Sequence, residues 1–447
     1  MLLRRSGSIA AAHLRAPSRL LQRASHTDAV VLTREYIYGA LYARESGYFA
    51  TRHVLHAPPA PIAFPELWGE REYRARVAEL YRTDAEAWLT PVEVFAPHYS
   101  RALARYMLSS PFCPPAGRFA VYEIGGGAGT NALHILDYLK EHAPDVYART
   151  KYTLIEISPV MAERQRARVA AAHPQQCEVI NTDILTFTDT HAPVPEQCFF
   201  VAMEVLDNLP HDKVALVGGK WFEAVVRMRS DEADATTPAL QLVEDLRPVE
   251  DMLIRQTMRL FGCELPLRVQ YRLNSSLARR VRSWVGKDET ELSAAFVPTG
   301  AMQLLNTLRA SFPRHHLIAA DFDALPAPTL APSSPVTALH HPLSLTATSA
   351  GTLCAANAPL VASKTSGGTQ DHDTYLVEGG IADIFFATDF AKLKKAYCSS
   401  LQRTPDEVSV VKSAAFLKEF ADTERTKTIT GYNPLLQDYS NTSFLLS

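Results

Sequence analysis

The chain has 447 residues and a formal net charge of −3 at neutral pH, with 47% hydrophobic and 21% charged residues. This length fits one large domain with insertions or two domains. The small net charge, without a basic region in the body of the chain, argues against nucleic acid as the main partner. The six cysteines are scattered and no apolar run is long enough to span a bilayer, so we predict neither a metal site nor a transmembrane segment.

The first 27 residues differ in composition from the rest of the chain. They contain five arginines and no acidic residue, and leucines alternate with arginines when the segment is projected on a helix. A basic amphipathic leader is typical of mitochondrial import, with a disordered basic tail as the alternative. We predict that residues 1–27 are a transit peptide, cleaved after about residue 24, and that the mature protein resides in the mitochondrial matrix.

Residues 28–115 are expected to form a helical N-terminal region. Apolar residues recur at helical spacing over 34–50 and 91–108, and a proline-rich insertion occupies 51–88. From 116 to 323 strands and helices alternate, which predicts a doubly wound α/β core.

A glycine-rich turn follows the first strand of this core. It carries Glu123, Gly125, Gly127 and Gly129, between an apolar run and an amphipathic helix. Strand, glycine turn and helix let the backbone approach a nucleotide-like ligand closely. Glu123 would repel a pyrophosphate but attract the sulfonium and amino group of S-adenosylmethionine, which we predict as the cofactor. A turn without a ligand is the alternative, although four glycines in five residues cost backbone entropy on folding.

The next two strands end in further acidic residues. An alternating run over 152–158 places Glu156 at its carboxyl end, where a carboxylate can accept both hydroxyls of a ribose. Ser158 then suits the N-cap of a helix. A third strand over 177–180 is followed by Asp183, which we predict to lie near the adenine, with plain turn chemistry as the alternative.

The residues predicted to face the substrate follow a fourth strand, 198–202. Glu204 and Asp207 come just after it, with Asp212 as a third candidate. An arginine side chain stays protonated, so its methylation needs carboxylates that localise its charge and orient a nitrogen toward the sulfonium methyl. The alternative for these residues is an acidic helix N-terminus that complements the helix dipole.

The remainder of the chain is uneven. A fifth strand is predicted at 221–228, and 230–298 breaks the alternation as a substrate-facing insertion. The alternation resumes with a helix over 301–312 and a strand over 316–321. The composition of 324–371 predicts a disordered low-complexity loop. Residues 372–447 are assigned to the C-terminal part of the core domain.

The sequence resembles the MidA-like S-adenosylmethionine-dependent methyltransferases, which include mitochondrial complex I assembly factors regarded as symmetric protein-arginine methyltransferases. The resemblance lies in separate blocks that follow the order of the family. These blocks are Tyr36 to Phe49, Thr90 to Glu93, Glu123 to Thr130, Ile155 to Ser158, Glu204 to Pro210, and Ala382 to Phe390.

This resemblance implies a Rossmann-like class I methyltransferase sheet, with a helical N-terminal segment and substrate-facing insertions. It also implies symmetric dimethylation of an arginine on a protein substrate, a core subunit of mitochondrial complex I, with Glu93 near the active site. A homodimer is compatible with it.

Several positions depart from the family pattern. Met203 replaces an Asn or His, Val205 and Leu206 replace two phenylalanines, His211 is displaced by one position, and Asp321 lacks the Tyr-Gly that follows it in the family. These changes affect the substrate side rather than the cofactor motifs. Two other functions therefore stay open: a non-catalytic assembly chaperone, and a nicotinamide-dependent oxidoreductase, which Glu123 disfavours.

Overall fold

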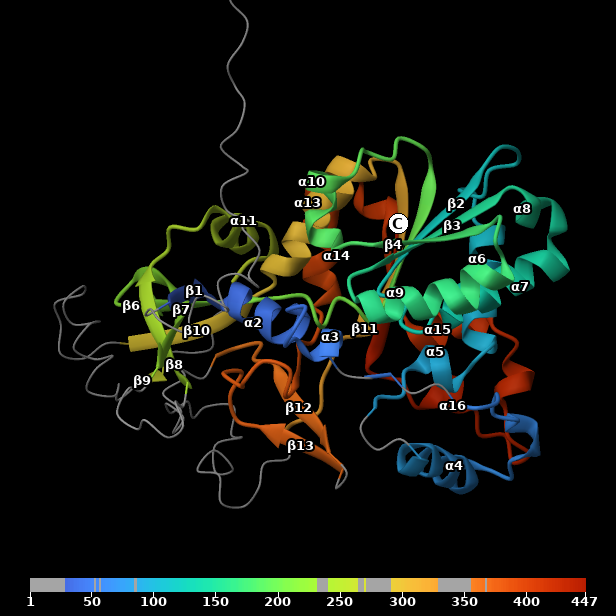
Figure 1. Ribbon diagram of the computed structural model, residues 1–447, viewed down its shortest axis with the longest axis horizontal. Coiled ribbons are helices and arrows are strands. Elements are labelled where there is room, and N and C mark those ends of the chain that lie inside the picture. The colour runs from blue at the N-terminus through green and yellow to red at the C-terminus, as the bar shows by residue number, and fades with distance from the viewer. Residues whose placement is uncertain are drawn as a thin grey trace, which may run out of the picture.

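A computed structural model describes residues 29–51, 54–55, 58–83, 87–230, 240–263, 269–270, 291–328, 355–365 and 368–447. Within these residues the chain forms three β-sheets flanked by helices (Figure 1). The expected transit peptide lies outside the described residues. No helix of the described part is both long and apolar enough to cross a membrane.

The main sheet has seven strands in the order β15-β16-β11-β5-β2-β3-β4. The strands are β2 (Phe119–Ile124), β3 (Thr150–Glu156), β4 (Cys177–Asn181), β5 (Cys198–Met203), β11 (His315–Phe322), β15 (Ser409–Lys412) and β16 (Thr442–Leu446). Neighbouring strands pair in parallel except β16, which is antiparallel to both β11 and β15. The chain turns to opposite sides of β2, which is the switch point where doubly wound sheets bind ligands. The predicted α/β Rossmann-like sheet is confirmed.

Helices cover both faces of this sheet because alternate strand residues point to opposite sides. Val121 packs into a core with α6 (His98–Ser109), α7 (Thr130–His142) and α15 (Ser413–Phe420). Its neighbour Ala120 packs into a second core with α13 (Thr299–Ser311) and α14 (Phe390–Leu401). The other core-domain helices are α8 (Pro144–Ala148), α9 (Pro159–Gln165), α10 (Phe187–Thr190) and α16 (Pro434–Gln437).

The second sheet is antiparallel and includes the strand predicted at 221–228. Its strands are β1 (Ala29–Leu32), β6 (Asp212–Val217), β7 (Lys220–Ser230), β8 (Leu240–Pro248), β9 (Val269–Gln270) and β10 (Glu291–Val297), with α11 (Met252–Phe261) beside them. Placing β7 as the fifth strand of the core was wrong. Gly218 and Gly219 both have left-handed φ angles and form a tight hairpin, which folds β7 back on β6. The fifth core position is filled by β11.

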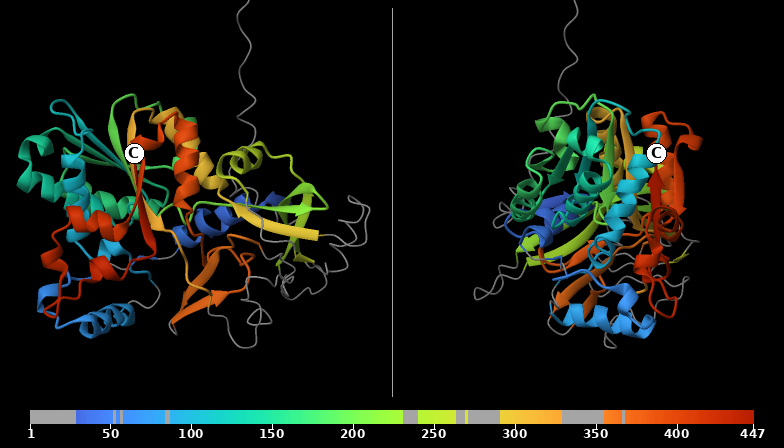
Figure 2. Two further views of the ribbon diagram at one scale, coloured as in Figure 1. Left: turned by 180° about the vertical axis from the view of Figure 1, so that it is seen from behind. Right: turned by 90° about the vertical axis from the view of Figure 1, so that its right-hand side faces the viewer.

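The third sheet corrects the predicted disordered loop. It consists of β12 (Leu360–Thr365), β13 (Gly368–His372) and β14 (Asp383–Phe385). Residues 329–354 lie outside the described residues. The part of the predicted loop that the structure describes includes β12, which pairs with β13 and β14 and buries Leu360 to Lys364. Figure 2 shows this sheet from behind, next to the second sheet and away from α7 and α8.

The N-terminal region is less continuous than predicted. It begins with strand β1 rather than a helix, and the expected helix over 34–50 is split into α2 (Thr33–Tyr42) and α3 (Tyr48–Thr51). The helix over 91–108 is likewise split, into α5 (Pro91–Val94) and α6, because Pro97 has no N–H to continue the helical bonding. The proline-rich insertion carries α4 (Glu70–Thr83). In Figure 1, α2 lies between the main and second sheets.

Candidate active site

The glycine turn after β2 has no room for side chains. Gly125, Gly127 and Gly129 have φ angles of +62°, +52° and +78°, in the left-handed region that favours glycine. A Cβ on Gly129 would lie 2.5 Å from Val169, and one on Gly127 would lie 2.7 Å from Leu55. Neighbouring side chains therefore pack directly against the backbone of this turn, which only glycines allow.

Glu123 lies beneath this turn and is 2% exposed. Asn131 Nδ2 donates to its Oε1 at 2.9 Å, and the Tyr152 hydroxyl donates to its Oε2 at 2.8 Å. Burial raises the pKa of Glu123 to about 7, although both hydrogen bonds favour the ionised form. Glu123 thus ties the glycine turn to β3 and α7.

Glu156 lies at the end of β3, and Gln165 links it to the glycine turn. Gln165 Nε2 donates to Glu156 Oε2 at 3.0 Å and to the Gly127 carbonyl at 2.8 Å, while the Ser158 N–H donates to Glu156 Oε1 at 2.8 Å. Burial raises the pKa of Glu156 to about 7. Gln165 Oε1 is buried and has no partner among the described residues, so an acceptor is left for a hydroxyl donor. This chemistry fits a ribose between Glu156 and the turn.

Asp183 occupies the N-cap of a short 3₁₀ turn, Ile184–Thr186, as the turn alternative predicts. Its Oδ1 accepts from the Leu185 N–H at 2.8 Å, and its Oδ2 accepts from the Tyr38 hydroxyl at 2.9 Å. Tyr42, one turn further along α2, donates to the Asn208 carbonyl at 3.1 Å. The sequence analysis missed these two tyrosines, although their spacing of four residues places them on one face of α2.

Four carboxylates gather at the carboxyl ends of β5 and β11 and on β14. They are Glu204, Asp207, Asp321 and Asp383. Asp321 Oδ2 accepts from the N–H groups of Leu206 and Asp207, at 2.7 and 3.1 Å, and so holds the loop after β5. Asp207 Oδ1 is buried and has no hydrogen-bond partner among the described residues.

The pKa values of these groups are raised by burial and by the charges of their neighbours. Burial raises the pKa of Glu204 well above its usual range, and the charges of Asp321 and Glu93 raise it further. Burial, followed by Asp321 and Asp383, raises the pKa of Asp207 in the same direction. A bound cation would relieve this repulsion and favour the ionised forms.

Glu204 has a backbone conformation that is uncommon for a residue with a side chain. Its φ angle is +52°, and its N–H donates to the Ala320 carbonyl at 2.9 Å. Such strain costs on the order of 1–3 kcal/mol and often marks functional positions. Glu204 lines a narrow cavity with the aromatic side chains of Phe95, Tyr99 and Tyr439.

Two parts of the sequence interpretation need correction. No helix begins between Glu204 and β6, so the helix-dipole alternative for the acidic residues after β5 is wrong. Asp212 lies elsewhere, at the start of β6, where it forms an ion pair with Arg34 at 2.7 Å. Glu93 lies on α5 and is 7% exposed. The Glu93 N–H donates to Oγ1 of Thr90, the N-cap of α5, at 3.4 Å.

Asp321 and Asp383 were missed as candidate site residues. Asp321 comes at the end of a predicted strand, as Glu123 and Glu156 do, so its position was a usable signal. Asp383 lies on β14, and hydrogen bonds join β14 and the residue after it to the loop that follows β5. Asn208 Nδ2 donates to Asp383 Oδ1 at 2.8 Å.

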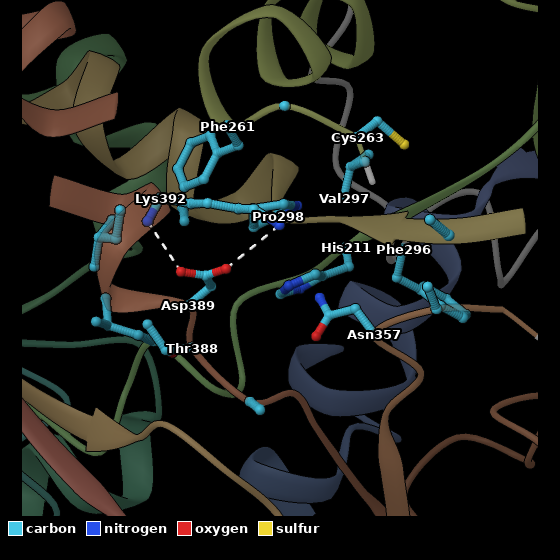
Figure 3. Close-up of a pocket in the computed structure, with 17 residues that line it drawn as sticks. His211, Phe261, Cys263, Phe296, Val297, Pro298, Asn357, Thr388, Asp389 and Lys392 are labelled. Atoms are coloured by element: carbon cyan, nitrogen blue, oxygen red, sulfur yellow. Dashed lines mark hydrogen bonds and ion pairs between the residues drawn. The ribbon is translucent and has the colours of Figure 1, made fainter. Parts of the chain in front are cut away.

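His211, one of the departures from the family pattern, packs against an aromatic ring. It stacks on Phe386 with ring centroids 3.8 Å apart, and its Nδ1 lies 2.8 Å from the Leu209 carbonyl. Burial lowers its pKa to about 4, so the imidazole is neutral. It lines a separate cavity of about 80 Å³. Figure 3 shows it there with Asn357 and the ion pair of Asp389 and Lys392.

No group of three or more His, Cys, Asp or Glu side chains in the described part of the chain is arranged to hold a metal ion. Five cysteines lie among the described residues, and all five are free thiols.

Comparisons with known proteins agree with this architecture. Residues 102–408 match the model of the family described as "Putative S-adenosyl-L-methionine-dependent methyltransferase". A curated relative, the "Protein arginine methyltransferase NDUFAF7 homolog, mitochondrial" of Schizosaccharomyces pombe, is 24% identical over 217 residues, covering 46% of this chain and 44% of that protein. The aligned part is therefore less than half of the relative's length.

Solved structures show the same fold. A Burkholderia thailandensis protein bound to S-adenosyl-homocysteine matches with a TM-score of 0.54 and 16% identity, covering 100% of this chain and 95% of that chain. A native structure from the same organism gives a TM-score of 0.53, also at 16% identity and with the same coverage. Since the family match spans more than half of the sequence, the chain belongs to this family of S-adenosyl-L-methionine-dependent methyltransferases, and its cofactor is S-adenosyl-L-methionine.

Proposed function

We propose that this protein is a protein arginine N-methyltransferase of the mitochondrial matrix, which forms symmetric dimethylarginine on a complex I subunit during assembly. The observation that carries the proposal is the carboxylate cluster around Glu204 and Asp207, at the edge of the sheet where the cofactor motifs end. The arginine specificity and the mitochondrial location of the Schizosaccharomyces pombe relative support it.

The cofactor supplies an electrophilic methyl group when bound. Glu156, Gln165 and the glycine turn would hold its adenosine part, with Asp183 toward the adenine. In the loop after β5, Glu204 and Asp207 would accept hydrogen bonds from the substrate guanidinium and orient one nitrogen toward the methyl group.

Transfer of a methyl cation to a guanidinium requires the loss of one proton. Asp207 Oδ1 is a suitable acceptor because it is buried, without a hydrogen-bond partner among the described residues, and has a raised pKa. Glu204 would keep its charge near the guanidinium, and Glu93 would add to the negative field around Glu204.

The side chains that line the site favour a flat cation. The cavity beside Glu204 is lined by Phe95, Tyr99 and Tyr439, and the Tyr99 hydroxyl lies 3.9 Å from Met203 Sδ. Aromatic rings with a carboxylate at their end suit a planar guanidinium, which stacks on rings and donates from its edge.

A second function is favoured by the size of the same cavity. It measures only about 10 Å³, which is close to the room that one water molecule needs. A non-catalytic chaperone would keep the cofactor fold and bind a complex I subunit without methylating it. The two functions share the cofactor site and differ in whether the carboxylates act.

Amide substitutions distinguish these functions. Glu204→Gln and Asp207→Asn keep the side-chain shape but remove the charge that orients the guanidinium, so methyl transfer should fall by on the order of 10²–10³. Affinity for S-adenosylmethionine should stay the same. Methyl transfer to a mitochondrial extract, measured with radiolabelled cofactor, checks this.

Asp323→Asn serves as the control, since Asp323 lies near the same strand end but pairs with Lys412. Unchanged transfer in both amide variants would rule out the catalytic assignment. Normal complex I assembly in cells that carry the inactive variants would favour the chaperone.

A further inference from the structure

Lys364, the fifth residue of β12, is held between two aromatic rings. Its Nζ lies 4.6 Å from the ring centroid of Tyr81 and 4.2 Å from that of Trp88, and it donates to Thr369 Oγ1 at 2.9 Å. Tyr81 belongs to the last turn of α4, and Trp88 follows a few residues later. We call the space between these two rings the aromatic slot.

Aromatic rings, rather than a carboxylate among the described residues, surround the Lys364 ammonium group in the slot. Lys364 is 9% exposed, and burial lowers its pKa. Among the described residues it forms no ion pair, so the two rings and one hydroxyl are the groups that compensate for its desolvation. Cation–π contacts are modest, and breaking them leaves no buried charge without its partner, as breaking a buried ion pair would. Another cation can therefore compete for this place.

The slot is built independently of Lys364. The Trp88 Nε1–H donates to the Tyr48 hydroxyl at 3.0 Å, and the Trp88 backbone N–H donates to the Val54 carbonyl at 2.8 Å. Tyr81 is fixed by its helix. Tyr81 and Trp88 are both half-buried, so neither residue is closed off from solvent.

The slot lies next to the carboxylate cluster. The ring of Trp88 contacts Phe385 edge-on, with centroids 6.2 Å apart, and Phe385 lies on β14 two residues after Asp383. Glu204 is close enough to raise the pKa of Tyr81, after the larger effect of burial. A peptide whose arginine reaches Glu204 would therefore pass close to the slot.

We propose that the aromatic slot binds a second cationic side chain of the substrate, flanking the methylated arginine, and that Lys364 occupies the slot until this side chain displaces it. This inference rests on the proposed function, because it requires a basic protein segment as substrate. It adds a specificity for two positive charges, and a built-in competitor that lowers affinity for segments with only one.

Binding of fluorescein-labelled peptides, followed by anisotropy, tests this separately from catalysis. The probes are Gly-Arg-Gly-Gly-Arg-Gly and its singly charged counterpart Gly-Arg-Gly-Gly-Gln-Gly. Lys364→Met removes the competing charge but keeps the apolar stem, so we expect it to bind the two-arginine peptide about tenfold more tightly. Its affinity for the one-arginine peptide should stay the same.

Lys364→Arg keeps the cation and should behave like the wild type, as should Lys427→Met on the exposed surface. If Lys364→Met does not fold, Trp88→Leu in the wild-type background gives the answer. It should abolish the preference for the two-arginine peptide, while binding of the one-arginine peptide persists.

The proposal would be overturned if a folded Lys364→Met protein bound the two-arginine peptide no more tightly than the wild type does. It would also be overturned if Trp88→Leu kept the preference for the two-arginine peptide, or if neither peptide bound any form of the protein. Normal peptide binding without methyl transfer would instead contradict the proposed function and leave the slot in place.

Discussion

At the scale of single residues, the candidate site contains several buried carboxyl groups, and burial disfavours their ionised form. Asp383 is 7% exposed, and burial raises its pKa to about 7 although Asn208 donates a hydrogen bond to it. The same cause raises the pKa of Asp321, at the neighbouring strand end. These groups destabilise the free protein at neutral pH and are suited to binding a cation.

The pH dependence of stability should reveal Asp383. A carboxyl group with a raised pKa binds its proton more tightly in the folded state, so its contribution is fully present below about pH 4 and is lost as the pH rises through about 7. Asp383→Asn should remove this loss. We expect its free energy of unfolding to exceed that of the wild type by on the order of 1–4 kcal/mol at pH 8, with no difference at pH 4.

Urea denaturation at several pH values measures this difference. The exposed Asp406→Asn is the control and should follow the wild type at every pH. If the free energy of unfolding of Asp383→Asn and of the wild type changed with pH in parallel, Asp383 would bind its proton no more tightly in the folded state than in the unfolded state.

At the scale of elements, one arginine of α2 forms ion pairs with the second sheet and with α11. Arg34 forms ion pairs of 2.7 Å with both Asp212 on β6 and Asp251 at the N-cap of α11. The side chain of Asp212 is fully buried, whereas that of Asp251 is 19% exposed. The same helix carries Tyr38 and Tyr42 to the cofactor side of the main sheet, so this clamp positions them.

Removing the arginine should be costly because it leaves a buried charge without compensation. We expect Arg34→Met to lower the free energy of unfolding by about 3–5 kcal/mol. Adding Asp212→Asn should restore part of that loss, since the amide carries no charge. Chemical denaturation of the single and double variants measures both effects.

Arg74→Met provides the comparison, because Arg74 forms an exposed ion pair with Glu70 within α4. Exposed pairs contribute about 0–1 kcal/mol. An Arg34→Met variant as stable as Arg74→Met would mean that the clamp contributes little to the fold.

At the scale of the whole molecule, the proposed cofactor site joins distant parts of the chain. Leu55 from the N-terminal region lies against the glycine turn, and Tyr38 reaches Asp183 in the main sheet. A ligand there should therefore stabilise the whole chain rather than one sheet alone.

S-adenosyl-homocysteine at a concentration of 100 times its Kd should stabilise the protein by about 2.7 kcal/mol. Gly127→Val should abolish this gain, because its side chain would fill the turn. Gly117→Val is the matched control: Gly117 also has a left-handed φ angle, of +82°, but no atom lies within 4 Å of its Cβ position. Thermal unfolding with and without ligand checks both. If the ligand stabilised Gly127→Val as much as it stabilises Gly117→Val, the cofactor would have to bind elsewhere.

The sequence by itself determined the central strands and the cofactor turn. The strand patterns that become β2 to β5 and β11, the glycines after β2, and the acidic residues at strand ends depend on local rules. Side-chain alternation fixes the faces of a strand, and the left-handed φ angles of a turn require glycine. Local rules of this kind can be read from neighbouring residues.

Only the tertiary structure decided the substrate side. Asp383 is 175 residues from Asn208 in the sequence, and Tyr38 is 145 residues from Asp183, yet each pair is joined by a hydrogen bond. The Gly218–Gly219 turn moved β7 into a separate sheet, and burial against β14 made a strand of a segment whose composition predicted disorder. Such contacts depend on how distant segments pack together, and no periodicity along the chain records which segments will meet.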